Sequence, residues 1–206
     1  MKCVNYGCGF TAPSQWMNYD SSLTLRFERI PILGRIYTKN GKRFPKNVKY
    51  GNIVRGLPVK NESIDIAFSS HMLEHLSLDD FRTALNNTVK MLKCGGVFRL
   101  VVPDLRFLAE VYLKSKDKDA CVQFVRNTLM GEEIGMKNLI TILYSAFQNR
   151  KHLWMWDYNS IKYELESAGF INVRECSFGD AENSMFNLVE EKSRFLMAVC
   201  VECKKV

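Results

Sequence analysis

The stretch Val4-Asn5-Tyr6-Gly7-Cys8-Gly9 is the most informative part of the chain, because an apolar run there leads directly into a Gly-x-Gly turn. A second short apolar run, Trp16-Met17-Asn18-Tyr19, follows and stops at Asp20. Many α/β sheets that bind a nucleoside have this order: a strand, a glycine turn, a second strand and an acidic residue at its end. The glycines let the backbone approach the ligand, and the carboxylate accepts hydrogen bonds from the ribose hydroxyls. Gly-x-Gly turns are common, so the rest of the chain decides how much the pattern means.

Length and composition are typical of a globular domain of ordinary size. The chain has 206 residues, of which 47% are hydrophobic and 25% are charged, so residues 1–206 are expected to form a single domain. No apolar run is long enough to span a membrane, and Met1-Lys2 leads directly into a strand rather than a signal peptide. We therefore expect no membrane span.

The cysteines indicate a reducing environment. Seven is an odd number, and most of them lie inside apolar runs. Cys200-Val201-Glu202-Cys203 has the spacing of a metal site, but no second pair of suitable spacing accompanies it. Buried reduced thiols and a cytoplasmic location are the expected outcome.

The formal net charge of +7 allows an anionic partner. Much of the positive charge falls in Arg26–Lys49 and Lys114–Lys118. We interpret these stretches as a solvated basic face in preference to a nucleic-acid site.

Strands and helices are predicted to alternate along the chain. Ser77 followed by Asp80 is a capping-box pattern, and the helix that it starts closes at Cys94-Gly95-Gly96. Such alternation indicates a doubly wound, Rossmann-like α/β sheet that is covered on both faces. The predicted strands are residues 49–54, 63–68, 97–102, 173–178 and 194–202, and residues 104–150 and 159–168 are predicted to be mainly helical.

Several stretches then follow in a specific order and spacing: Asn5–Gly9, Trp16–Asp20, Gly56–Asp65, Ser69-Ser70-His71-Met72-Leu73-Glu74-His75-Leu76, Leu92–Asp104 and His152–Asp157. On these stretches the chain resembles a class I S-adenosylmethionine-dependent methyltransferase, of the small bacterial type often found among surface-polysaccharide genes. Each stretch is loose, but together they cover most of the chain except roughly residues 23–46 and the middle helices.

The resemblance implies a sheet of about seven strands whose last strand runs antiparallel, with S-adenosylmethionine bound across the strand tips. Residues 105–158 lie after the fifth strand, and we expect this helical insertion to form a cap over the strand tips. The cofactor-binding residues that it implies are Asn5, Gly7, Cys8, Gly9, Asp20, Ser21, Asn52, Ile53, Ser69, Ser70 and His75.

The chain departs from the family pattern near its start. Residues 10–15 leave no room for the helix that usually follows the glycine turn, so a turn is expected there. Asn5 replaces the usual acidic residue and can accept a hydrogen bond from the cofactor's ammonium group without pairing with its charge. Asn52 replaces an aspartate and can still accept from the adenine amino group. The basic, aromatic segment 21–46 is a candidate lid.

His71-Met72-Leu73-Glu74-His75 also reads as the zinc-peptidase pattern His-x-x-Glu-His. That interpretation needs a third, acidic ligand on a downstream helix. The candidates have no supporting context, and the same letters stand where the methyltransferase resemblance expects them, so no metal is predicted. The candidates are Glu132, Glu133, Glu164 and Glu166.

Methyl transfer to a hydroxyl needs a base, and an imidazole is suited to this near neutral pH. His71 at a strand tip is the first candidate, and His152 and Asp104 are the alternatives. The stretch His152-Leu153-Trp154-Met155-Trp156 is either an aromatic wall for the acceptor or an ordinary helix-entry patch. Tyr144, Phe147 and Tyr158 could extend such a wall.

Three function classes remain open. Methyl transfer to a small-molecule or glycan acceptor is the first. A nucleic-acid methyltransferase is favoured by the charge, but Ser69-Ser70-His71-Met72 lacks the aromatic clamp for an extruded base. A non-catalytic cofactor-binding or partner-binding module is the third, favoured by Asn5. The oligomeric state and the identity of the acceptor do not follow from the sequence.

Overall fold

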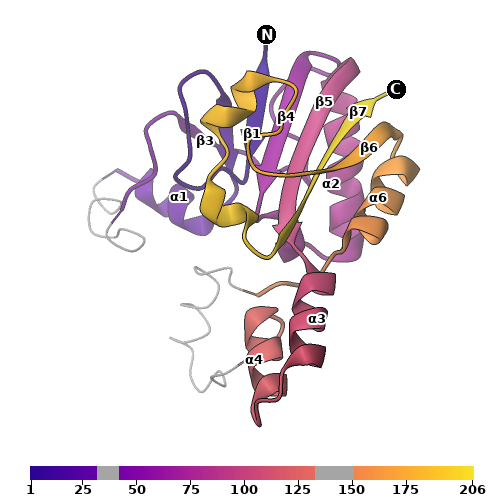
Figure 1. The fold of residues 1–206 in the computed structure, drawn as a ribbon. Coiled ribbons are helices and arrows are strands. Elements are labelled where there is room, and N and C mark those ends of the chain that lie inside the picture. The colour runs from indigo at the N-terminus through magenta and orange to yellow at the C-terminus, as the bar shows by residue number, and fades with distance from the viewer. Residues whose placement is uncertain (32–41, 133–150) are drawn as a thin grey trace.

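Seven strands form one sheet in the order β3-β2-β1-β4-β5-β7-β6 in a computed structural model that describes residues 1–31, 42–132 and 151–206 (Figure 1). Neighbouring strands are parallel except at β7, which runs antiparallel to both β5 and β6. The predicted Rossmann-like sheet with an antiparallel last strand is therefore confirmed. The strands are β1 (Cys3–Tyr6), β2 (Met17–Asp20), β3 (Val48–Tyr50), β4 (Ile64–Ser70), β5 (Leu92–Pro103), β6 (Phe170–Cys176) and β7 (Ala198–Lys205).

The strand order reverses beside β1. The chain runs outward from β1 to β3 and then returns to place β4 on the other side of β1. The connections on the two sides of this point leave the sheet in opposite directions, which opens a crevice beyond the carboxyl ends of β1 and β4.

β1 and β2 are joined by turns instead of a helix, as the short connection predicted. The backbone N–H of Cys8 donates to the carbonyl of Tyr19 at 3.1 Å, and that of Trp16 donates to the carbonyl of Pro13 at 3.1 Å. These bonds satisfy backbone groups that a helix would otherwise have paired, and they hold the glycine turn against the end of β2.

One face of the sheet is covered by helices. Helix α2 begins at Ser77, whose hydroxyl accepts a hydrogen bond from the backbone N–H of Asp80 at 3.2 Å, as predicted from the sequence. α2 and α6 pack side by side on this face (Figure 1) and bury Phe81, Leu85 and Leu165 completely. The helices are α1 (Leu23–Glu28), α2 (Leu78–Met91), α3 (Leu105–Lys114), α4 (Ala120–Asn127) and α6 (Tyr158–Ser167), with 3-10 turns η2 (Leu73–His75), η3 (Ser184–Leu188) and η4 (Lys192–Phe195).

The opposite face is covered by the segment between β6 and β7. Phe186 of η3 is fully buried and packs against Trp16 and Phe68, with ring centroids 5.8 and 6.1 Å away. This segment supplies apolar cover on the face where the connection after β1 has no helix.

Arg99 holds this segment to the sheet. Its side chain is fully buried on β5 and donates to the carboxylates of Glu190 (2.5 Å), Glu202 (3.2 Å) and Asp180 (2.9 Å). Burial alone would lower the pKa of Arg99, but Cys200 and the carboxylates of Asp180 and Glu190 outweigh burial and raise it above its usual value. A buried guanidinium is stable only when its donors are paired in this way.

Several predicted boundaries are wrong. Helix α2 ends at Met91, and Cys94-Gly95-Gly96, which were predicted to close it, belong to β5 because their backbone continues the strand. The strand predicted over residues 49–54 stops at Tyr50, because the Asn52 side chain accepts from the backbone N–H of Val54 at 2.8 Å and turns the chain. The strand predicted over residues 194–202 begins at Ala198, and η4 precedes it. Arg194 therefore lies in η4 and outside the sheet.

All seven cysteines are free thiols. Cys200 and Cys203 belong to clusters on opposite faces of β7, so they cannot share a metal ion. Among the described helices, none combines the length and the apolar character that a membrane span requires.

Candidate active site

A shallow, open hollow lies at the carboxyl ends of β1 and β4, where the strand order reverses. Four of the predicted cofactor residues line it, namely Asn5, Gly7, Cys8 and Ser70. Thr11, Phe68, Val189 and Arg194 complete the lining. The hollow therefore brings together residues from both halves of the chain.

The glycine turn forms one wall of the hollow. Gly7 and Gly9 have φ angles of +65° and +55°, which L side chains rarely adopt. A Cβ on Gly7 would lie 2.4 Å from Cγ of Met72, so no larger residue fits there. The bare backbone is left free to approach a ligand closely.

Asp20 joins the glycine turn to the end of β2. Its carboxylate accepts from the backbone N–H of Gly9 at 3.0 Å and from that of Ser22 at 2.8 Å. Each carboxylate oxygen keeps a further lone pair that can accept from a ribose hydroxyl. Ser21, beside it, is exposed.

Asn5 is buried and its amide nitrogen is engaged. Nδ2 donates to the carbonyl of Thr11 at 2.9 Å, which leaves Oδ1 as the atom that could accept from an ammonium group. The hydroxyls of Ser69 and Ser70 are also buried, and neither has a hydrogen-bond partner among the described residues. Since Ser70 lines the hollow, its hydroxyl can bind the polar amino-acid end of S-adenosylmethionine. The glycine turn, Asp20 and these unpaired hydroxyls fit that cofactor.

Asn52 and Ile53 lie after β3 and do not line the hollow. The Asn52 oxygen accepts from Val54, and Ile53 is 4% exposed. Their contact with an adenine stays a prediction. The Asn52 oxygen would have to accept from the adenine amino group and from the backbone N–H of Val54 at the same time.

Arg194 is a residue of the hollow that sequence reasoning missed. Its Nη1 donates to the carbonyl of Ser70 at 3.3 Å, and its guanidinium approaches Gly9. The sequence pattern assigned Arg194 to the last strand, and no motif in Lys192–Phe195 marks it as a ligand-binding residue.

Beside the hollow lies a histidine–glutamate cluster of His71, Glu74, His75 and His152. His71 follows β4 with φ of +50°, and its Nε2 lies 2.7 Å from the carbonyl of Arg194. Its Nδ1 lies 3.4 Å from Oε1 of Glu74. Burial alone would lower the pKa of His71, but the Glu74 carboxylate and the Arg194 carbonyl outweigh burial and raise it.

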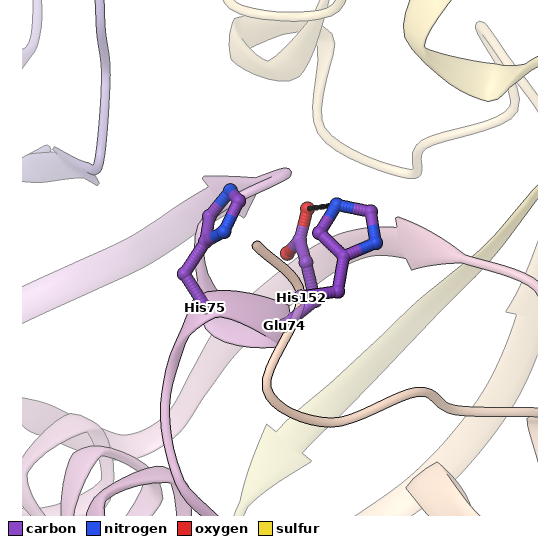
Figure 2. Close-up of side chains that lie close together, drawn as sticks. All are labelled: Glu74, His75 and His152. Atoms are coloured by element: carbon purple, nitrogen blue, oxygen red, sulfur yellow. Dashed lines mark ion pairs between the residues drawn. The ribbon is translucent and has the colours of Figure 1, made fainter. Parts of the chain in front are cut away.

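His152 enters the cluster from the segment that follows the helical insertion. Figure 2 shows its ring beside the Glu74 carboxylate, with Nε2 3.9 Å from Oε1, and the His75 ring on the same side of the turn. Burial lowers the pKa of His152, and the attraction of Glu74 offsets this only in part. The structure thus unites His71, His75 and His152, all the histidines of the chain.

Asp104 and the aromatic stretch lie nearby but have other contacts. The Asp104 carboxylate accepts from the backbone N–H of Arg106 at 2.9 Å and caps α3. Trp156 is 2% exposed and packs on Phe81 at 4.2 Å, so its prediction as part of an acceptor wall is wrong. Its large apolar ring is buried in the core instead. Trp154 is 41% exposed and can still contact an acceptor.

The helical insertion is described in part. α3 and α4 extend beyond the edge of the sheet where β5 ends (Figure 1). Tyr144 and Phe147, which were predicted to extend the wall, and Glu133 lie outside the described residues, as do residues 32–41 of the candidate lid.

We compared the sequence and the fold of the chain with those of known proteins. Residues 4–100 match the family model described as a methyltransferase domain. Among solved structures, the chain is similar to an S-adenosylmethionine-dependent methyltransferase from Thermotoga maritima, described as a possible histamine N-methyltransferase, with 19% identity and a TM-score of 0.50 over 100% of this chain and 82% of the other. A methyltransferase from Archaeoglobus fulgidus has 13% identity and a TM-score of 0.50 over 99% and 86%. No curated protein sequence matches the chain.

Other similar structures belong to longer proteins. Phosphoethanolamine N-methyltransferase 2 of Haemonchus contortus, solved with S-adenosylmethionine, has 14% identity and a TM-score of 0.50 over 100% of this chain and 49% of that one. The chain therefore spans about half the length of that enzyme. The structural likenesses establish the fold, and the match over residues 4–100 establishes the domain. Residues 4–100 therefore match a methyltransferase domain, and the similar structures show that the chain has the fold of S-adenosylmethionine-dependent methyltransferases.

Proposed function

We propose that this chain transfers a methyl group to a hydroxyl of a small-molecule or glycan acceptor. The observation that carries the proposal is that Arg194, which lines the hollow together with the glycine turn, has its backbone carbonyl 2.7 Å from Nε2 of His71. When bound, S-adenosylmethionine supplies an activated sulfonium methyl group. The chain's own task is then to align the acceptor, exclude water and remove one proton.

The proposed cofactor contacts follow the lining of the hollow. Gly7 and Gly9 offer backbone at close approach, and the Asp20 carboxylate accepts from the ribose hydroxyls. Asn5 lacks a negative charge for the cofactor's ammonium group, but Arg194 supplies a positive charge for its carboxylate. We assign Arg194 this role because a charge-assisted hydrogen bond is stronger than a neutral one.

His71 is the proposed base. Nε2 faces the Arg194 carbonyl and Nδ1 faces the Glu74 carboxylate, so His71 takes the acceptor's proton from a neutral form in which one of these two contacts is released. Glu74, 3.4 Å away, would stabilise the imidazolium that forms. The His71 side chain is 27% exposed, so an acceptor can reach it.

Residues 105–158 are proposed to cap the acceptor. α3 and α4 project beyond the sheet edge, and exposed apolar side chains such as Phe107 and Tyr112 suit contact with a sugar ring or an aromatic acceptor. A nucleic-acid acceptor is the alternative that the charge of +7 favours.

The test combines cofactor calorimetry with a methyl-transfer screen using radiolabelled cofactor and panels of sugars, phenols and RNA. His71→Asn is the informative variant, because asparagine tolerates the left-handed backbone and its amide nitrogen can take the position of Nδ1 beside Glu74 without acting as a base. We expect turnover to fall about 10²- to 10⁴-fold with cofactor affinity nearly intact. Loss of cofactor binding in this variant would move His71 into the cofactor pocket, and methylation of RNA alone would overturn the acceptor class.

A further inference from the structure

Glu74 is buried without the partners that a carboxylate needs. Its side chain is 0% exposed, and neither oxygen has a hydrogen-bond partner among the described residues. A buried, unpaired carboxylate is strongly unfavourable unless a cation or a proton neutralises it. Its recorded ion pairs are with His71 at 3.4 Å and His152 at 3.9 Å, both longer than a good charge-assisted hydrogen bond.

Two imidazoles converge on this carboxylate. One ligand atom from each of Glu74, His75 and His152 lies within 4.8 Å of the others. Figure 2 shows that the first two come from one 3-10 turn and that His152 approaches from a distant segment.

The surrounding contacts orient these groups as they would around a metal ion. Nδ1 of His75 lies 2.8 Å from the carbonyl of Lys151, and donation to that oxygen leaves the lone pair on Nε2. Ligating histidines typically donate their other N–H to a carbonyl in this way. His71 stands against Glu74 as a ligating carboxylate's outer hydrogen-bond partner would.

We propose that Glu74, His75 and His152 bind one divalent transition-metal ion of the zinc type. Two imidazoles and one carboxylate are a ligand set that Zn²⁺ accepts, with metal–ligand bonds of about 2.0–2.2 Å. Tetrahedral coordination would bring the ligand atoms to about 3.4 Å from one another, so the 3.9 Å pair needs about half an ångström of movement and the other pairs, which lie within 4.8 Å, need up to about 1.4 Å.

The ligand set differs from that of the zinc-peptidase pattern. In that pattern both histidines of His-x-x-Glu-His are ligands on one helix, whereas here His71 contacts the Arg194 carbonyl and residues 73–75 form a 3-10 turn. The third ligand, His152, takes the place of the downstream acid that the sequence lacked. The prediction of no metal is replaced by this proposal, and peptidase activity does not follow from it.

The position of the proposed metal site would allow the ion to take part in methyl transfer. Three protein ligands leave one coordination position open, and His71 connects the cluster to the hollow through Arg194. This use rests on the proposed function: an acceptor hydroxyl at the open position would be polarised and would lose its proton more readily.

The test measures metal binding in the absence of acceptor and cofactor. The protein is prepared without a histidine tag and with Cys94→Ser and Cys121→Ser, since these two exposed thiols could bind metal themselves. After chelator treatment it is titrated with Zn²⁺ by calorimetry and with Co²⁺ by visible absorption. We expect one ion per chain and the d–d bands of a low-symmetry cobalt site.

Variants separate this site from adventitious binding. Three variants should each weaken Zn²⁺ binding at least about 100-fold: His152→Ala, Glu74→Gln and His75→Asn, of which the last changes a half-buried side chain. Glu110→Gln, on the exposed face of α3, should leave Zn²⁺ binding unchanged. Circular dichroism checks folding, and His75→Asn keeps the test valid if the buried variants do not fold. No stoichiometric binding, or binding that persists in all three variants, would overturn the proposal. Methyl transfer by the metal-free protein would show that the proposed function stands without the metal.

Discussion

Replacing Asp20 with alanine should separate cofactor binding from overall stability. The Asp20 carboxylate is 8% exposed and accepts two backbone N–H groups, from Gly9 at 3.0 Å and from Ser22 at 2.8 Å. It is also the proposed acceptor for the ribose hydroxyls. Asp20→Ala therefore removes a charge from the sheet edge and releases the glycine turn at the same time.

The expected loss of affinity follows from the number of bonds. A hydrogen bond to a charged group contributes about 1.5–3 kcal/mol. Each 1.4 kcal/mol is a factor of about ten in the dissociation constant, so one lost ribose bond weakens binding roughly 10- to 100-fold. Asp20→Asn keeps one acceptor oxygen and should lose less.

Asp65→Ala is the matched control. Asp65 lies near the amino end of β4, at the opposite edge of the sheet. Its carboxylate accepts from the backbone N–H of Lys2 and from the side-chain ammonium of Lys93, each at 2.6 Å. Both alanine variants should lower the urea midpoint, but only Asp20→Ala should lower cofactor affinity by titration calorimetry. Equal affinity in the two variants would refute the placement of the ribose at Asp20.

Two further predictions concern the segment before β7. Arg194→Met should weaken binding of S-adenosylmethionine about tenfold, because the cofactor's carboxylate loses its proposed partner. Lys192→Met, in the same 3-10 turn, should leave the affinity unchanged. Titration calorimetry measures both affinities. Arg99→Met should lower the unfolding free energy by about 3–5 kcal/mol in urea denaturation, because Glu190 and Glu202 stay buried without their cation; an unchanged midpoint would contradict the role of this network.

Local features of the site could be read from the sequence. A strand that ends in Gly7-Cys8-Gly9, and a second that ends in Asp20, place these residues at one edge of a parallel sheet because parallel strands share their carboxyl edge. Residues 10–15 were too few for a helix, and they form turns. Asn52 shows the limit of such reasoning, since its side chain ends β3 through a local hydrogen bond that competes with the strand.

Only the tertiary structure could bring Arg194 and His152 to the site. His71 contacts the Arg194 carbonyl across 123 positions of sequence, because β7 runs antiparallel beside β5 and starts at the edge where β1 and β4 end. His152 reaches Glu74 after the whole helical insertion, with the backbone N–H of Leu153 donating to the Glu74 carbonyl at 2.8 Å. Strands and turns form through contacts between neighbouring residues, so the local sequence is enough to predict them. Contacts between distant segments depend on strand order and on how the insertion folds back, and periodicity does not encode either.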